Sequence, residues 1–334
     1  YSNVIWTSSS VIAGGSENQI GNRWSYLERG HTIAGGERNT IDYDVRYSTI
    51  AGGSDNYLDD DWSTVGGGWS NTIWWSAGDG HTIAGGENNQ ISAFWGCTIS
   101  GGAENRIGAP AVLGDGSVCA TIAGGQYNTI TNGSFSAIGG GSANTARGKY
   151  NTISGGQSNA VPTGLNAAVG GGFSNTATAD YATVPGGAQA TARLFGQMAY
   201  ASGQFSSPGD AQSSLFVCRG VTTNATQGEL FLDGASARMV VPTNSTWSFE
   251  ILISGRAANG NSAAFRFLGA IKNNNGALSL LGTPLKNALG QDVPSWDASL
   301  AADTPNQDLS LRVTGQASTS IRWVANVRTT EVAY

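Results

Sequence analysis

The pattern of apolar and polar residues follows a short phrase, Thr-Ile-Ala-Gly-Gly-x-x-Asn-x-Ile, which recurs eleven times between Val11 and Ala192. Two positions before the first glycine of each aligned pair the residue is always Ile or Val, which predicts one inward-pointing column. Four positions after that glycine an Asn follows in every copy except the last, where Ala190 stands. Consecutive aligned glycines are 15 to 23 residues apart, so the minimal repeat has 15 residues. Helical repeats of about 33 to 47 residues and propeller blades of about 40 to 50 are longer, so we expect short β-coils.

Each coil is predicted as a strand, a corner, a second strand and a loop, because Thr, Ile and Val favour extended backbone. Gly-Gly and Asn are expected to supply the positive φ angles of tight corners. Eleven coils stacked about 4.8 Å apart would give a rod of roughly 50 Å. For the Asn column we expect either stacked side-chain amides or left-handed corners, without a ligand.

The pattern changes after Ala192, where the glycine pairs stop. Residues 193–212 are interpreted as a connector, and residues 213–334 as a separate domain after the repeat domain of residues 1–192. Apolar residues alternate there at Trp247, Phe249, Ile251 and Ile253, and again from Ile321 to Val327, between turn clusters rich in Asn and Gly. This alternation predicts eight to ten strands in an antiparallel, jelly-roll-like β-sandwich. The fold class expected for the whole chain is therefore all-β.

Composition and charge narrow the possible partners. Gly contributes 49 of 334 residues and charged residues only 12%, so a thin coil buries little apolar surface alone and we expect oligomerisation. A formal charge of −6 argues against nucleic acid and anionic membranes as partners. There is no stretch of 18 apolar residues and no signal segment, so membrane insertion is not expected. The chain begins at Tyr1 inside a repeat-like stretch, which leads us to expect a fragment or processed product with an attachment domain upstream.

The run Thr121 to Asn128 (TIAGGQYN) resembles the head repeat Ser-Val-Ala-Ile-Gly-x-x-Ser-x-Ala of trimeric autotransporter adhesins, the YadA-like head. This resemblance covers about residues 4–192 and implies a homotrimeric, left-handed parallel β-roll, a form of β-solenoid. Such repeats occur in bacterial surface adhesins and in phage tail fibres and tailspikes. Residues 200–205 (YASGQF) and 224–226 (NAT) are similar to segments that follow these repeats in phage tail proteins.

Two function classes follow from this resemblance. Autotransporter adhesins end in a coiled coil and a four-strand membrane anchor, and this chain has neither. We therefore interpret the protein as a phage tail fibre or tailspike of the virion tail, outside the cell, that binds host surface polysaccharide or lipopolysaccharide. The alternatives are a bacterial surface adhesin and a polysaccharide-depolymerising tailspike.

The repeats are decorated mainly in the amino-terminal half. The first six junctions between aligned glycines carry 20 residues beyond the minimal coil, the last four carry 2, and seven of the ten tryptophans precede Cys97. An aromatic column five positions before the aligned glycine, with Tyr47, Trp62, Phe135, Tyr150 and Tyr181, is read as a packing ladder. The other aromatics stand beside Asp, Asn or Ser, which suits sugar rings, with packing between protomers as the alternative. The candidate carbohydrate-binding residues are Trp24, Tyr26, Tyr43, Trp74, Trp75, Phe94, Trp95, Asp42, Asp44 and Asp79.

Candidate chemistry beyond binding is sparse. Glycoside hydrolysis needs two carboxyl groups, which Glu28, Asp42, Asp44, Asp59 to Asp61 and Asp79 could supply, yet we expect recognition without turnover and hence no enzyme. His31 and His81 lie three coils apart and cannot share a site. No metal-site spacing or cofactor motif occurs, so no metal and no cofactor are expected. Cys97 and Cys119 lie close enough in consecutive coils to bridge, although a reducing cytoplasm would leave all three cysteines free.

Overall fold

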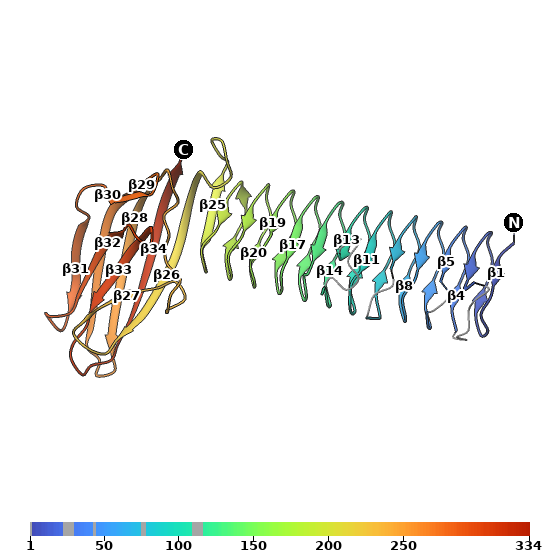
Figure 1. The fold of residues 1–334 in the computed structure, drawn as a ribbon, viewed down its shortest axis with the longest axis horizontal. Coiled ribbons are helices and arrows are strands. Elements are labelled where there is room, and N and C mark those ends of the chain that lie inside the picture. The colour runs from blue at the N-terminus through green and yellow to red at the C-terminus, as the bar shows by residue number, and fades with distance from the viewer. Residues whose placement is uncertain (1, 23–29, 43–44, 75–77, 109–115) are drawn as a thin grey trace. The chain divides into compact units, whose positions relative to one another are not determined.

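The computed structural model describes residues 2–22, 30–42, 45–74, 78–108 and 116–334. Every regular element in these residues is a β-strand, and the chain divides into two compact units, Tyr1–Phe173 and Ser174–Tyr334. The architecture is a parallel β-solenoid of about 11 turns with antiparallel sheets at the carboxyl terminus (Figure 1). The predicted boundaries at residues 192 and 212 stay predictions.

The first unit consists of short strands that alternate between two parallel sheets, one strand of each sheet per coil. The first sheet has the order β1 (Val4–Ile5), β3 (Gln19–Ile20), β5 (Thr40–Ile41), β7 (Tyr57–Leu58), β9 (Thr72–Ile73), β11 (Gln90–Ser92), β13 (Arg106–Gly108), β15 (Thr129–Thr131), β17 (Thr145–Arg147) and β19 (Ala160–Val161). The second contains β2 (Val11–Ile12), β4 (Thr32–Ile33), β6 (Thr49–Ile50), β8 (Thr64–Val65), β10 (Thr82–Ile83), β12 (Thr98–Ile99), β14 (Thr121–Ile122), β16 (Ala137–Ile138), β18 (Thr152–Ile153) and β20 (Ala168–Val169).

Two apolar columns form the core of this solenoid. The predicted column is buried from Ile33 to Val169, with at most 1% of each side chain exposed, whereas Ile12 in the first described coil is only half-buried. The second column, from Ile20 to Val161, lies on the other sheet and is fully buried. The strands pair in register, Thr opposite Thr and Ile opposite Ile, as in Thr82↔Thr98 and Ile83↔Ile99. The prediction of an inward Ile/Val column is confirmed.

The corners use positive φ at the glycine pair and at two further places in a coil, and only the glycines were predicted. The second glycine of the pair has a positive φ, such as +94° at Gly86. The residue just before the Asn is also left-handed, such as Asn88 with φ +52°, although ordinary side chains occupy this position. The third place is the aromatic column, where Trp62 has φ +49°. The expectation that the recurring Asn itself takes a left-handed conformation is therefore wrong.

The Asn column forms a buried amide ladder along the solenoid. The Asn71 side chain donates from Nδ2 to Oδ1 of Asn56 (3.1 Å), and its own Oδ1 accepts from the backbone N–H and from Nδ2 of Asn89 (3.1 and 3.0 Å). Asn71 Nδ2 also lies 2.9 and 2.8 Å from the carbonyl oxygens of Gly67 and Gly86. Each amide thus satisfies the corner backbone of its own coil and of the next, which confirms the stacked-amide alternative.

A second column lies four residues before each aligned glycine; it holds Ser, His, Asn, Cys and Ala and is buried from His31 onward. Ser63 Oγ accepts the backbone N–H of His81 (2.9 Å), and His81 Nδ1 accepts that of Cys97 (3.1 Å). His31 Nδ1 likewise accepts the backbone N–H of Ser48 (3.3 Å). Burial lowers the pKa of His31, and lowers that of His81 to about 4, so both rings are neutral at pH 7. The two histidines are therefore structural groups, as their separation in the sequence indicated.

The second unit begins with further parallel strands. β21 (Thr176–Ala177) pairs with β24 (Thr191–Ala192), while β22 (Thr183–Val184) and β23 (Gly187–Ala188) pair with β25 (Met198–Ser202). β25 lies inside the predicted connector. Its buried positions are only Ala199 and Ala201, which alternate with exposed Met198 and Tyr200, so small residues hid the strand pattern.

Two antiparallel sheets complete the second unit. One runs β26 (Ala211–Thr222), β34 (Ile321–Ala333), β28 (Ser245–Ala257) and β29 (Ser262–Asn274), with β30 (Ala277–Leu280) and β31 (Leu285–Gln291) beyond. The other runs β27 (Gln227–Leu230), β33 (Asp308–Thr314) and β32 (Asp297–Asp303). Both contribute to one apolar cluster that contains the predicted inward residues of β28 and β34 and the buried Trp296. The antiparallel prediction is confirmed, and the jelly-roll connection stays a prediction.

Candidate functional site

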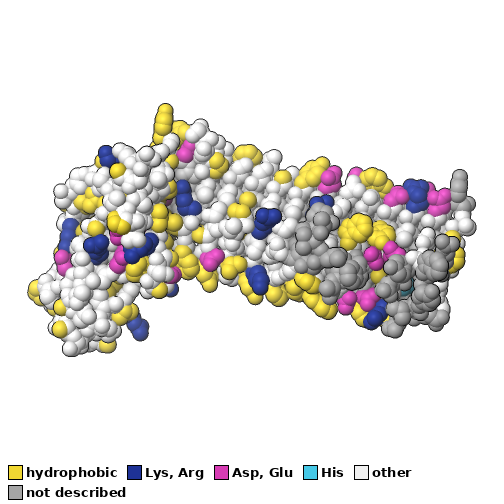
Figure 2. Space-filling view, in the orientation of Figure 1, with side chains coloured by type: hydrophobic (Ala, Val, Ile, Leu, Met, Phe, Trp, Pro, Cys, Tyr) yellow, Lys and Arg dark blue, Asp and Glu magenta, His cyan; other side chains and the backbone are white. Residues whose placement is uncertain are grey.

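The structure describes half of the predicted carbohydrate-binding residues. Trp24, Tyr26, Tyr43, Asp44 and Trp75 lie outside the described residues. The other five fall into two groups within the amino-terminal unit. Asp42 and Trp74 belong to the outer face of the first sheet, and Asp79, Phe94 and Trp95 to the loops before the corner. Figure 2 shows hydrophobic and acidic side chains next to one another on this part of the solenoid.

Asp42 and Trp74 meet through two residues that were not among the predicted binding residues, Tyr57 and Asp59. Asp42, Asp59 and Trp74 each follow a strand of the first sheet, at the same position of three consecutive coils. The backbone N–H of Asp42 donates to Leu58 O and that of Asp59 to Ile73 O, both at 2.9 Å, so the register between coils is fixed. Tyr57 begins the middle strand, β7, on the same outward face. We call these four residues the Tyr57 cluster.

The phenol of Tyr57 holds the cluster together. Its hydroxyl donates a short hydrogen bond to Oδ2 of Asp42 and also interacts with the carboxylate of Asp59. Burial, followed by these two carboxylates, raises the pKa of Tyr57 far above its usual value, so the phenol stays protonated and remains a donor. The Tyr57 ring lies 5.3 Å from that of Trp74, at an interplanar angle of 49°, and 47% of Trp74 is exposed. Carboxylate acceptors thus lie beside an exposed aromatic face.

Tyr57 departs from the residue pattern of its sheet. The first residue of the strands in this sheet is otherwise mostly Thr or Gln, so an aromatic at this position departs from the pattern. Asp59 was counted among the loop carboxylates, although it directly follows β7. Tyr57 meets Asp42 because the strands of successive coils pair in register, and the sequence alone does not give this register.

The second group lies near the corner. Asp79 and Trp95 occupy the same position of consecutive coils, and Gly96 N–H donates to Asp79 O (3.0 Å). Phe94 is half-buried and its N–H donates to Ser117 O (2.9 Å), while half of Trp95 is exposed. Trp95 therefore faces solvent, whereas Asp79 and Phe94 are partly buried among the loops.

Asp60, Ser63 and His81 resemble a nucleophilic triad in composition but not in geometry. Ser63 Oγ donates to Asp60 Oδ2 (3.0 Å), not to the imidazole. His81 Nε2 lies 3.0 Å from Ala93 O and 3.4 Å from Asp60 Oδ2, and its Nδ1 is occupied by a backbone N–H. All three side chains are buried, so no substrate reaches them.

The predicted aromatic ladder exists in pieces on the surface. Phe135 and Tyr150 stack with ring centroids 5.4 Å apart and planes 5° apart, and Tyr47 and Trp62 stack at 6.2 Å. About half of each of these four side chains is exposed. The ladder is therefore a packing feature that still presents aromatic surface.

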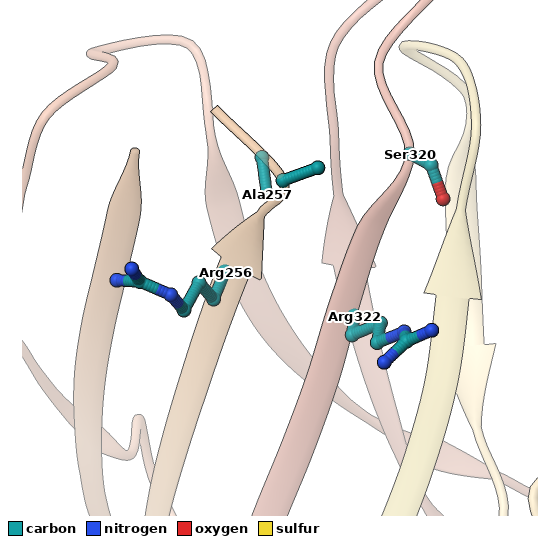
Figure 3. Close-up of a pocket in the computed structure, with 5 residues that line it drawn as sticks. Arg256, Ala257, Ser320 and Arg322 are labelled. Carbon is teal, nitrogen blue, oxygen red and sulfur yellow. The ribbon is translucent and has the colours of Figure 1, made fainter. Parts of the chain in front are cut away.

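The second unit contains a cationic pocket of about 380 Å³, lined by Arg256, Ala257, Ala258, Ser320 and Arg322. The two arginines are direct cross-strand neighbours, an arrangement in which like charges repel. Figure 3 shows their guanidinium groups pointing to opposite sides, away from each other. Arg256 donates to Gly260 O and Ser262 Oγ (3.3 and 3.2 Å), so the pair does not converge on one ligand position.

Metal and thiol chemistry can be stated for the described residues only. Within them, no group of three or more His, Cys, Asp or Glu side chains is arranged to hold a metal ion. Cys97, Cys119 and Cys218 are free thiols, with Cys119 exposed and the others buried. The described part of the chain also has no helix with the length and hydropathy that crossing a membrane requires.

Comparison with known proteins gives structural neighbours but no family. No family model and no curated protein matches the chain, so the YadA-like resemblance stays a prediction. Among solved structures, the chain is similar to the tailspike gp49 of Acinetobacter baumannii bacteriophage Fri1, a capsular polysaccharide depolymerase (9% identity, TM-score 0.23, covering 91% of this chain and 72% of that one). It is also similar to the tailspike of Acinetobacter phage vB_ApiP_P1 (8% identity, TM-score 0.18, covering 99% and 82%).

Both neighbours are phage tailspike proteins, the class of protein that the sequence predicts for this chain. One expectation is corrected by the same finding. The sequence favoured recognition without turnover, whereas the Fri1 neighbour is named as a depolymerase and hence as an enzyme. The expectation that this protein is not an enzyme is therefore withdrawn.

Proposed function

We propose that the protein is a phage tailspike that attaches to a host surface polysaccharide through the Tyr57 cluster. The observation that carries this proposal is the convergence of Asp42, Tyr57, Asp59 and Trp74 on one outward face. Sugar rings stack their C–H faces on aromatic rings while their hydroxyl groups donate to carboxylates. An exposed indole on the same face as two carboxylates offers both kinds of contact. Several copies of such a site on one particle bind a repetitive polymer by avidity.

The test is binding of the purified protein to host cells and to their extracted polysaccharide. Trp74→Ala is expected to weaken binding at least about tenfold, equivalent to about 1.4 kcal/mol per site. Trp69→Ala is the matched control, because Trp69 is exposed to a similar degree but lies at another position of the coil. Equal binding by Trp74→Ala and wild type would refute the assignment to this cluster.

A second candidate function, hydrolysis of the polysaccharide, is favoured by the two carboxyl groups of the cluster. Asp42 and Asp59 share the same phenol oxygen, and two oxygens hydrogen-bonded to a common oxygen are within about 6 Å of each other. This range includes the separation of about 5 to 5.5 Å between the carboxyl groups of retaining glycosidases. Asp42 would attack the anomeric carbon while Asp59 donates a proton to the departing oxygen. Water activated by Asp59 would then release the sugar from Asp42.

Hydrolysis is tested by the appearance of new reducing ends in host polysaccharide. Asp42→Asn and Asp59→Asn are each expected to lower the rate by at least about 100-fold while binding is retained. Asp55→Asn serves as the control, because Asp55 is a partly exposed carboxylate near the cluster that pairs with Arg38 (2.7 Å). Unchanged rates in both cluster variants would assign the cleavage to other residues.

We also propose that three copies assemble into the working particle on the virion tail. Val217, Val324 and Leu252 lie on the outer face of neighbouring strands β26, β34 and β28 and are 44% to 48% exposed. Exposed apolar patches of this kind are typical of protein interfaces. Native mass measurement should give about three times 34.3 kDa. Val324→Glu should lower the native mass, whereas the control Thr330→Glu on the same face should leave it unchanged. A monomeric wild type would contradict this proposal.

A further inference from the structure

The corner column, the residue five positions before each aligned glycine, has a continuous backbone from Trp62 to Tyr150. In each coil its N–H donates to the carbonyl of the residue that precedes the same position one coil earlier. The series is Gly80 to Asp61 (3.0 Å), Gly96 to Asp79 (3.0 Å), Cys119 to Trp95 (2.8 Å), Phe135 to Val118 (2.7 Å) and Tyr150 to Ser134 (3.0 Å). All these residues have φ between +49° and +80°. Insertions in the preceding loops therefore leave the corner itself regular.

The side chains of this column are interrupted although its backbone is not. Trp62 and Phe135 are aromatic, whereas the three coils between them carry Gly80, Gly96 and Cys119, all exposed to solvent. Four coil steps of about 4.8 Å place the two aromatic residues about 19 Å apart. We call this stretch the corner trough, with Trp62 and Phe135 as its ends and Gly80, Gly96 and Cys119 as its floor.

Asp61 precedes the Trp62 end of the corner trough, and Asp79 and Trp95 precede its floor positions Gly80 and Gly96. Half of Trp95 is exposed, and Asp79 is partly exposed. Among the described residues, the Arg46 guanidinium is engaged by Asp61 (3.3 Å) and lies over the Trp62 ring at 5.9 Å. The described rim therefore offers aromatic faces and acidic acceptors, with its one cation already paired.

We propose that the corner trough binds a short, neutral, hydroxyl-rich oligosaccharide segment. Sugar rings would pack on Trp62 and Trp95, and their hydroxyl groups would donate to Asp79. The carboxylates would repel a uronic acid at this point, so the segment is uncharged. A length of about 19 Å accommodates several rings, which suits a polymer better than a monosaccharide. The proposal rests on the proposed polysaccharide attachment and extends it to a second surface of the same coils.

The sharpest test fills the floor without disturbing the fold. Gly96→Tyr places an aromatic side chain at φ +55°, a conformation that Tyr150 already adopts in the same column at +62°. A Cβ at Gly96 would meet only Cys119 Sγ, at an ordinary contact distance of 3.6 Å. Asn166→Tyr is the matched control, because Asn166 is exposed in the same column at φ +55° but lies outside the trough. Binding is measured on an array of neutral hexose oligosaccharides and their uronate-containing counterparts.

Wild type and Asn166→Tyr are expected to bind neutral oligosaccharides with the same affinity. Gly96→Tyr is expected to bind them at least tenfold more weakly. Wild type is expected to bind uronate-containing oligosaccharides more weakly than neutral ones. Cys119 gives an independent readout, because it is the exposed cysteine and belongs to the floor. The bound oligosaccharide should slow its alkylation by iodoacetamide in wild type and in Trp74→Ala.

Three results would overturn the proposal. If Gly96→Tyr binds oligosaccharide as tightly as wild type, the trough is not a binding site. The proposal for the Tyr57 cluster would be unaffected, because it is tested separately by Trp74→Ala. A lower native mass of Gly96→Tyr would show that another copy of the chain occupies the trough. Failure of wild type to bind both the array and host polysaccharide would refute attachment itself.

Discussion

At the scale of single residues, buried polar side chains set the register of the solenoid. Asn71 contacts both neighbouring amides of its ladder, and the Ser63 and His81 side chains accept backbone N–H groups of the next coil. A slip of one residue would leave these groups without partners in a dry interior, which costs about 1 to 3 kcal/mol each. The polar columns therefore specify alignment, while the aliphatic columns supply hydrophobic stabilisation.

His81 makes the stability of its coil depend on pH. Burial lowers its pKa from 6.5 to about 4, so below pH 6.5 the unfolded chain binds the proton first and the folded state loses stability down to about pH 4. The expected loss is about 3 kcal/mol, from about 1.4 kcal/mol per pKa unit. Urea unfolding at pH 7 and pH 4.5 measures it.

The matched variant for this prediction is His81→Ser, because Ser48 and Ser63 occupy the same column and accept the same kind of N–H. The difference in stability between wild type and His81→Ser should shrink as the pH falls. A constant difference would mean that His81 titrates normally. Asp60, 3.4 Å away, is present in both proteins and is not varied.

At the scale of elements, the corner decides whether two-residue strands can stack. Gly86 has φ +94°, and a Cβ there would lie 2.1 Å from Gly102 O and 2.7 Å from Asn89 Nδ2. Gly85 beside it would meet nothing closer than 4.0 Å. The two glycines of each pair, equivalent in the sequence phrase, therefore have different roles.

Gly86→Ala is expected to lower the free energy of unfolding by on the order of 3 kcal/mol, because left-handed strain adds to the displacement of a neighbouring coil. Gly85→Ala should cost less than about 1 kcal/mol. Chemical denaturation of both variants compares them directly. Similar losses would mean that the corner relaxes around an added methyl group.

The sequence predicted the repeating frame better than the surface built on it. The Ile column, the amide ladder and the alternation in β28 and β34 follow from periodicity, because each repeats the same local environment. Strand β25 was missed, since its core positions are alanines. The meeting of Asp42 with Tyr57 was also missed, because it joins residues 15 positions apart through a register that becomes visible only when strands pair.

At the scale of the whole molecule, the solenoid is assembled from interchangeable coils. Removing residues 140–154 joins Gly139 to Gly155 and keeps every column in phase, since these 15 residues are one minimal coil. We expect the shortened protein to fold with a small change in stability, because each coil contacts mainly its neighbours. Removing residues 140–153 leaves one extra residue between Ile138 and its glycine pair, so the corner of that coil is out of phase and the unfolding midpoint should fall further. Circular dichroism during thermal unfolding distinguishes the two.

The left-handed corner column separates what holds the molecule together from what it displays. Gly, Cys, Asn, Phe, Tyr and Trp all occupy it with the same backbone hydrogen bond and nearly the same φ. A substitution at such a position needs no compensating substitution elsewhere in the chain. Selection can therefore change the exposed side chains one coil at a time, and recognition of a new surface can evolve while the solenoid backbone is kept.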